Sequence, residues 1–264
     1  MFAYEFMRTA FAAAFLAAFV CGPVGWFLVL RGQSFASHAL SHVGFAGAAA
    51  ALLVGEPAFA GFGLSAVISG MGMGVASDRF VGRDVMIGLV LSLAMGTGAL
   101  CLHFLTHSTG AATALLFGDI LGIASSSLYW LAALAIGCLA SLAMLSRPLL
   151  FASLQPEVAE ANGVNLRLLD VLFLALVGIA SAMCSQLTGV LLVFTLMVAP
   201  AAASLRLGFG PLQGMAVAFG LALFEAWGGL YLSWLTDCPA SFWIALLGSV
   251  VFAVANGVAY LRGR

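Results

Sequence analysis

The chain has 264 residues, of which 64% are hydrophobic and 7% charged, and its mean hydropathy is +1.17. A soluble domain carries about 25% charged residues, and under half of it is apolar. So much apolar surface needs a bilayer as its solvent, and at about 20 residues per helical span the chain can cross it roughly eight or nine times. The composition therefore predicts an all-α polytopic membrane protein, with residues 1–264 forming a single transmembrane domain.

The basic residues exclude several functions. All nine are arginine, and the chain has no lysine. A P-loop and Schiff-base chemistry both need lysine, so we expect neither on this chain. Dispersed arginines with a net charge of −1 are not typical of a nucleic-acid surface, so we expect no nucleic-acid partner.

The cysteines form no CxxC pair and lie mostly in apolar stretches. This pattern favours small buried hydrophobic residues over a zinc or disulfide framework. The residues concerned are Cys21, Cys101, Cys138, Cys184 and Cys238.

Charged residues mark the ends of the predicted spans, because a charge is costly at the bilayer centre. The uncharged intervals predict helices over 9–30, 32–55, 57–77, 85–105, 128–146, 211–235 and 241–261. The interval 171–205 is too long for one span, and residues 186–189 split it into a hairpin of two. A weaker segment, 111–123, predicts a short or re-entrant helix. The predicted count is nine, give or take one.

The arginines predict the orientation, because positive residues stay cytoplasmic. Under the nine-span count all of them except Arg8 fall on one side. This places the C-terminus inside the cell and the N-terminus outside.

One cytoplasmic segment, near 153–167, predicts a short helix at the membrane surface. Pro156 can start it, and Gly163 suits its end. Glu157 and Glu160 suit its positive N-terminal end. Such a helix between two spans is a candidate docking element, and an ordinary amphipathic loop is the alternative.

Two histidine pairs have i,i+4 spacing, which places each pair on one helix face. His38 and His42 could bind a borderline divalent metal such as zinc, or form hydrogen bonds to neighbouring helices. His103 and His107 lie at the outer end of the fourth span. They could help to receive a metal, or have no role, since an interfacial histidine costs little.

Three acidic residues are further candidates. Asp119 and Glu225 lie inside apolar stretches, where each could be a proton or cation site or pair with an arginine or a backbone donor. Asp237 precedes Cys238 and a proline at the outer end of a span, which suits a turn or gate. The glycine-rich stretch 61–74 is typical of close helix packing rather than phosphate binding.

Five segments, in order along the chain, resemble the membrane permeases of ABC importers for zinc, manganese and iron. Residues 28–42 resemble the family's opening, which is an apolar span, a basic residue and then Gly-Asp-x-Leu-Ser/Ala-His. Residues 116–121 match its LFGD segment. Residues 156–170 resemble its cytoplasmic loop, 189–202 its GxLL…PAA span, and 237–240 a late DTPAG-type turn.

The resemblance implies a homodimeric permease subunit in the inner (plasma) membrane of a prokaryote, with a path at the two-fold interface. It implies no permanently bound cofactor, because the divalent metal is the substrate. A partner ABC ATPase would bind the short cytoplasmic helix, and an extracytoplasmic metal-binding protein would deliver the ion. The ATPase-coupling residues would be Pro156, Glu157, Glu160, Gly163 and Arg167.

His42 matches the family's channel histidine, whereas His38 stands where the family usually has Asp. Exchanging carboxylate for imidazole shifts ligand preference from manganese toward zinc, so zinc is the predicted substrate. Glu225 has no family counterpart that we can place. The predicted metal pathway contains His38, His42, Asp119, His103, His107 and Asp237.

Two other classes of protein remain. A secondary metal carrier would use the same histidines without an ATPase, but it has no reason to keep the 153–167 loop. A membrane metalloenzyme such as a di-iron oxygenase needs more histidines than the four present, and the HExxH motif is absent. The residues favour the importer over both.

Overall fold

The computed structural model describes residues 4–76, 83–105, 110, 115–118, 120, 122–123, 125–190 and 192–262. Within these ranges the chain is helical and contains no strand. The helices are α1 (Glu5–Leu30), α2 (Ser34–Leu53), α3 (Ala58–Ala76), α4 (Arg83–Phe104), α6 (Ser125–Leu154), α7 (Pro156–Ala161), α8 (Leu166–Thr188), α9 (Val193–Arg206), α10 (Pro211–Thr236) and α11 (Ala240–Leu261). Among the described residues, eight helices are long and apolar enough to cross a membrane, which confirms the all-α polytopic prediction.

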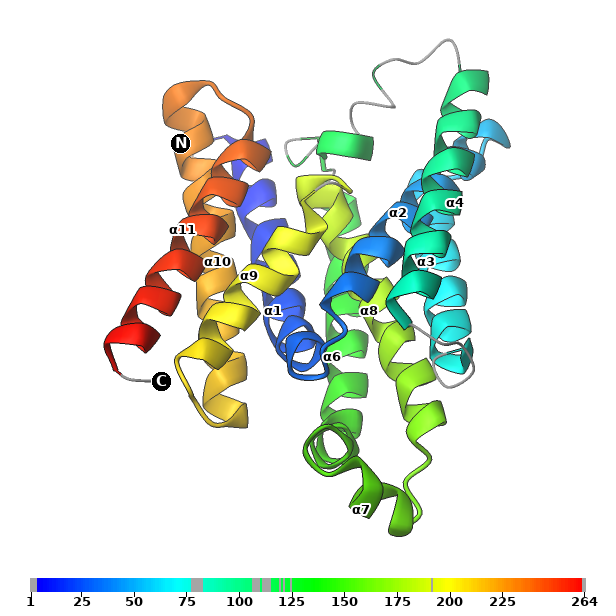
Figure 1. The fold of residues 1–264 in the computed structure, drawn as a ribbon. Helices are drawn as coiled ribbons and strands as arrows, with labels where there is room; N and C mark the ends of the chain where they lie inside the picture. The colour runs from blue at the N-terminus through cyan, green and yellow to red at the C-terminus, as the bar shows by residue number, and fades with distance from the viewer. Residues whose placement is uncertain are drawn as a thin grey trace.

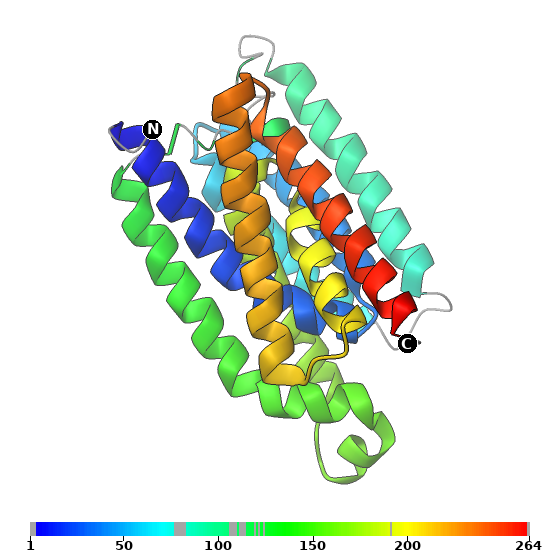
Figure 2. The same ribbon diagram turned by 90° about the vertical axis from the view of Figure 1, so that its left-hand side faces the viewer.

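The predicted hairpin over 171–205 is present, but its second half is wrong in length. α9 has 14 residues, and at 1.5 Å per residue it spans about 21 Å against a hydrocarbon core of about 30 Å. α9 packs against α1, α10 and α11 in the interior of the bundle (Figure 2). A helix enclosed by other helices need not extend from one bilayer surface to the other.

Several predicted helix ends at charged residues are also wrong: α1 begins at Glu5, before Arg8, and α4 begins at Arg83. α8 begins at Leu166, before Asp170, and α6 continues past Arg147 to Leu154. Asp170 is tolerated inside the helix because its carboxylate is paired with Arg31. A single charge therefore does not end a helix when the fold supplies a partner or when the helix extends beyond the bilayer.

The bundle is organised around α1 and α8 (Figure 1). α1 contacts α6, α8, α9 and α10, whereas α8 contacts α2 and α3 as well as α1 and α6. α4 lies on the outside of this second group, against α2. Most of α1 is buried, and seven of its fifteen buried residues are alanine or glycine, which let neighbouring helices approach closely.

Glycines mark the closest of these approaches. A Cβ on Gly61 would collide with the carbonyl oxygen of Gly47, and one on Gly74 with the backbone of Val171. Gly63 and Gly72, in contrast, have no such neighbour within 4 Å among the described residues. The predicted packing role of the 61–74 stretch is therefore confirmed for part of it.

The two ends of the bundle differ in charge. The C-terminal ends of α1, α9 and α11 and the start of α8 lie at the same end as α7 (Figure 1). Arg31, Arg206, Arg262 and Arg167 belong to these helix ends. The start of α1 and the α10–α11 turn lie at the opposite end. This arrangement agrees with a cytoplasmic C-terminus.

The cysteine prediction is confirmed in part. Cys21, Cys138 and Cys184 are buried, and Cys101 is half-buried. Cys238 is exposed in the turn between α10 and α11, so the prediction of a buried residue is wrong there.

Candidate functional site

The candidate metal site begins one turn into α2. The rings of His38 and His42 meet edge to face, and their centroids are 4.8 Å apart. His42 is 5% exposed, whereas His38 is half-buried and packs its ring against Phe194 of α9 at 5.7 Å. The i,i+4 spacing thus brings the two imidazoles together as the sequence predicts.

Neighbouring side chains leave His38 available. Ser37 and Ser41 donate to backbone carbonyls within α2, at 2.9 and 2.8 Å, rather than to an imidazole. The Nδ1 atom of His38 is buried and has no hydrogen-bond partner among the described residues. A buried polar atom of this kind is costly unless something binds it.

The pair does not complete a metal site within one chain. In the part of the chain that the structure describes, no group of three or more His, Cys, Asp or Glu side chains gathers in a geometry that could hold a metal. Zinc prefers four ligands, so two imidazoles supply half of a tetrahedral shell. The remaining ligands must come from outside these residues.

The other predicted pathway residues that the structure describes, His103 and Asp237, lie apart from the pair. His103 is exposed in the last turn of α4, and its predicted partner His107 lies outside the described residues, as does Asp119. Asp237 is exposed at the C-terminal end of α10, in the left-handed conformation with φ 52°. Asp237 lies in the α10–α11 turn, whereas the histidine pair follows the α1–α2 turn. These two turns lie at opposite ends of the bundle (Figure 1).

Asp237 lines a cavity of about 550 Å³ at the outer end. Its walls are formed by the start of α1, the C-terminal end of α10, the N-terminal end of α11, and residues 117, 118 and 120. Its described lining includes Ser233, Cys238 and Ser241 but neither His38 nor His42. The cavity is thus a separate feature beside the α10–α11 turn. The predicted turn is present at Asp237, and the predicted gate stays a prediction.

The predicted cytoplasmic helix is present as α7, over Pro156–Ala161, and is shorter than the 153–167 range. Pro156 is its first residue, and Gly163 follows its end with φ 84°. Ala159 is fully buried between the flanking helices, whereas Glu157 and Glu160 are exposed. α7 therefore presents an acidic surface while its other face holds it to α6 and α8.

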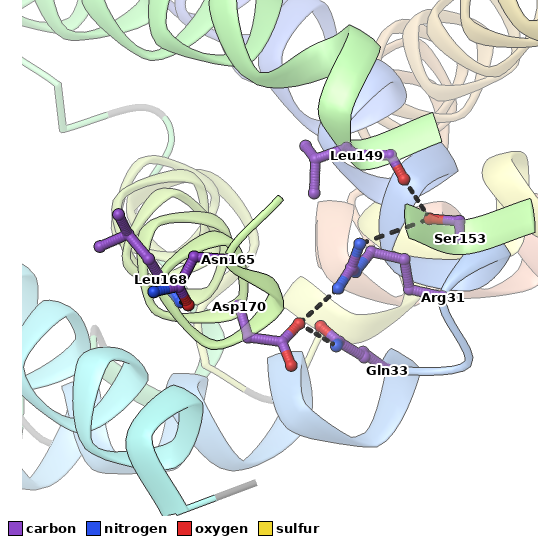
Figure 3. Close-up of polar contacts among 7 residues, drawn as sticks. All are labelled: Arg31, Gln33, Leu149, Ser153, Asn165, Leu168 and Asp170. Carbon is purple, nitrogen blue, oxygen red and sulfur yellow. Dashed lines mark hydrogen bonds and ion pairs between the residues drawn. The ribbon is translucent and has the colours of Figure 1, made fainter. Parts of the chain in front are cut away.

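Arg167 follows α7 in the first turn of α8 and is half-buried. The side chain of Asn165 caps this helix by accepting from the amide of Leu168 at 3.0 Å (Figure 3). This cap stabilises the start of α8, which follows the end of α7 after a short turn.

A polar network that no sequence pattern predicted joins the α1–α2 turn to α6 and α8 (Figure 3). Arg31, in the α1–α2 turn, forms an ion pair with Asp170 of α8, and both side chains are about nine-tenths buried at 9% and 13% exposure. Its other terminal nitrogen donates to Ser153 of α6 at 3.4 Å. Gln33 also donates to Asp170, at 3.2 Å.

Glu225 is the remaining buried acid. It is fully buried in α10, near Gly248 of α11 and Thr195 of α9. Neither carboxylate oxygen has a hydrogen-bond partner among the described residues, so the predicted arginine or backbone partner is not found there.

Comparison with known proteins identifies the class. A family model described as "ABC 3 transport family" matches residues 3–259. The chain belongs to this family of ABC transport permeases. It is a multi-pass protein of the inner membrane and a transport permease, not an enzyme.

Individual relatives cover nearly the whole chain. The "Manganese transport system membrane protein MntC" of Halalkalibacterium halodurans is 25% identical over 97% of this chain and 88% of its own length. A "Probable metal transport system membrane protein" of Treponema pallidum is 30% identical, over 95% and 94%. A "Probable iron transport system membrane protein" of Haemophilus influenzae is 26% identical, over 99% and 96%.

A solved structure shares the fold. A chain of "PsaBC from Streptococcus pneumoniae in complex with Fab" superposes with a TM-score of 0.86 at 21% identity, covering 96% of this chain and 91% of that one. The arrangement of helices around α1 and α8 is therefore the fold of a known ABC permease.

Proposed function

We propose that this chain is the permease subunit of an ATP-driven importer for divalent transition-metal ions, and that its substrate is zinc. The observation that carries the proposal is the pair of adjacent imidazoles of His38 and His42, one turn into α2. Imidazole suits zinc better than it suits manganese, which favours carboxylate and other oxygen ligands. The relatives are named for manganese, iron or an unspecified metal, so the choice of zinc depends on His38.

A second copy of the chain would complete the site. Two chains that meet along α2 would contribute four imidazoles, which is the ligand number that zinc prefers. The half-buried ring of His38 and its unpartnered Nδ1 atom support this arrangement. Four neutral ligands would bind the ion without a carboxylate, and a transport site must bind weakly enough to release its ion.

The partners follow from the same proposal. A separate ATPase would supply the nucleotide site, because the chain has no lysine for a P-loop. It would dock on the exposed acidic surface of α7. An extracytoplasmic metal-binding protein would deliver the ion at the end of the bundle that carries the α10–α11 turn. ATP binding would then switch access to the site between the two sides of the membrane.

Metal uptake in cells that express the chain with its ATPase and binding protein tests this function. We expect ATP-dependent zinc accumulation that is lost in His42→Ala at unchanged membrane level. A matched control is Ser146→Ala, because Ser146 is half-buried on α6 and, among the described residues, its hydroxyl donates to the carbonyl of Ala143 in the same helix.

Three outcomes contradict parts of the proposal. Uptake that persists without the ATPase means a secondary carrier. Manganese or iron uptake with zinc excluded disproves the metal assignment. ATP-dependent zinc uptake that is unaffected by His42→Ala removes the histidine pair from the path.

A further inference from the structure

We propose that Arg31 and Asp170 are positioning residues that transmit movement of α7 to the start of α2, where the histidine pair lies. This inference rests on the proposed function, because it assigns a route between the ATPase-docking helix and the metal site. It concerns the network of Arg31, Gln33, Ser153 and Asp170, called here the relay cluster.

Two residues of the relay cluster, Ser153 and Asp170, flank α7 in the sequence. Ser153 lies in the last turn of α6, three residues before α7 begins, and Asp170 is the fifth residue of α8. Both side chains bond to the same guanidinium, that of Arg31 (Figure 3). Because α7 packs on both flanking helices through the buried Ala159, a force on α7 displaces both of these attachment points.

The other side of the relay cluster is joined directly to the metal site. Arg31 and Gln33 belong to a three-residue turn between Leu30, the end of α1, and Ser34, the start of α2. His38 follows one turn later. A shift of this corner therefore moves the first turn of α2 and the imidazoles that it carries.

The corner is stiff enough to move as a unit. The backbone amides of Arg31, Gly32 and Gln33 donate to the carbonyls of Phe27, Val29 and Leu28, at 3.0, 3.0 and 2.9 Å. The Arg31 guanidinium also lies 5.6 Å from the ring centroid of the buried Phe173 on α8. A corner that is held by local backbone hydrogen bonds and packed against a neighbouring helix transmits displacement better than a flexible surface contact does.

The side chain of Arg31 is suited to linking the α1–α2 turn to both α6 and α8. A guanidinium offers donors in a fixed fork, so one Arg can hold α6 through one terminal nitrogen and α8 through the other. Among the described residues of the cluster, the positive charge of Arg31 and the negative charge of Asp170 compensate one another, which lowers the cost of burying them.

The test measures coupling between hydrolysis and transport. The complex of this chain with its ATPase is reconstituted in vesicles that hold ATP and a zinc indicator inside, with the metal-binding protein and zinc outside, and the number of zinc ions moved per ATP hydrolysed is measured. We expect Asp170→Asn to lower this ratio at least fivefold while the ATPase remains bound and hydrolyses ATP. Ser153→Ala, which removes only the bond to α6, should lower the ratio by a smaller factor.

Two further variants separate transmission from simple loss of folding. Arg31→Lys keeps the charge but loses the fork, so we expect an intermediate ratio. The double swap of Arg31→Asp with Asp170→Arg should recover part of the ratio lost in Asp170→Asn. Ser146→Ala on the same helix as Ser153 should leave it unchanged.

A ratio that is unchanged in Asp170→Asn, Ser153→Ala and Arg31→Lys overturns the relay, even if zinc uptake by the wild-type complex confirms the proposed function. If Asp170→Asn does not reach the membrane, Ser153→Ala and Arg31→Lys decide the matter. A wild-type complex that moves no zinc with ATP overturns both proposals, so the two failures are distinguishable.

Discussion

The imidazole of His38 lies edge to face against that of His42, 4.8 Å away between ring centroids, and both project from the first turns of α2. Substituting Asp for His38 gives the carboxylate–imidazole pattern that the family resemblance predicts at this position. We expect His38→Asp to shift the ratio of zinc to manganese uptake toward manganese by about tenfold, which corresponds to ~1.4 kcal/mol. Competitive uptake of the two radiolabelled metals measures the ratio within one variant, and an unchanged ratio contradicts the assigned role of His38.

The exposed surface of α7 should bind the ATPase. Val158 is 47% exposed between Glu157 and Glu160. Because docking would bury it, we expect Val158→Asp to weaken ATPase binding by at least about tenfold, since a buried unpaired charge costs several kcal/mol. Co-purification of the ATPase with the tagged permease measures this. Gln213→Asp adds the same charge to an exposed site in the first turn of α10 and should leave binding unchanged.

Gly25 is needed for the contact between α1 and α9. A Cβ at this position would collide with the backbone carbonyl of Met197, which cannot move as a flexible side chain could. We expect Gly25→Ala to destabilise the protein by about 1–3 kcal/mol. Thermal unfolding in detergent measures the change. Gly137→Ala on α6 is the control, because no described atom lies within 4 Å of its Cβ position; equal destabilisation by both would show that the contact does not matter.

We expect the buried carboxyl group of Glu225 to lower the free energy of unfolding. Both carboxylate oxygens are buried without a hydrogen-bond partner among the described residues. Replacing this group by an apolar side chain of similar size removes a desolvation cost, so we expect Glu225→Met to stabilise the fold by about 1–3 kcal/mol.

The contrasting variant for Glu225→Met is Gln33→Met, which removes a donor to Asp170. It should destabilise the fold by about 1.5–3 kcal/mol, because hydrogen bonds to charged groups contribute that much. Thermal unfolding of both variants compares the two buried polar groups directly. A lower stability of Glu225→Met would mean that its carboxyl has a partner outside the described residues.

Cys238 reports the orientation of the chain. It is exposed in the α10–α11 turn, whereas Cys21, Cys138 and Cys184 are buried. A membrane-impermeant maleimide added to spheroplasts should therefore label Cys238 from outside, and Cys238→Ser should lose that label. Labelling of Cys238 only in inside-out vesicles would reverse the assigned orientation.

The sequence by itself determined the class of the protein and the position of its short-range features. Apolar intervals of about 20 residues can be stable only as membrane helices, so composition decided the all-α architecture. The start of α7 at Pro156, its end before Gly163, and the shared face of His38 and His42 were also predictable. Each depends on backbone preferences over a few residues, which the local sequence contains.

Only the tertiary structure decided which distant residues meet. Arg31 and Asp170 are 139 residues apart, and the rule that charges end helices gave no sign that the two would neutralise one another. The reduced length of α9 and the exposure of Cys238 likewise depend on which helices enclose a segment and which leave it open. Hydropathy reports how apolar a residue is, but its partner is set by the packing of whole helices.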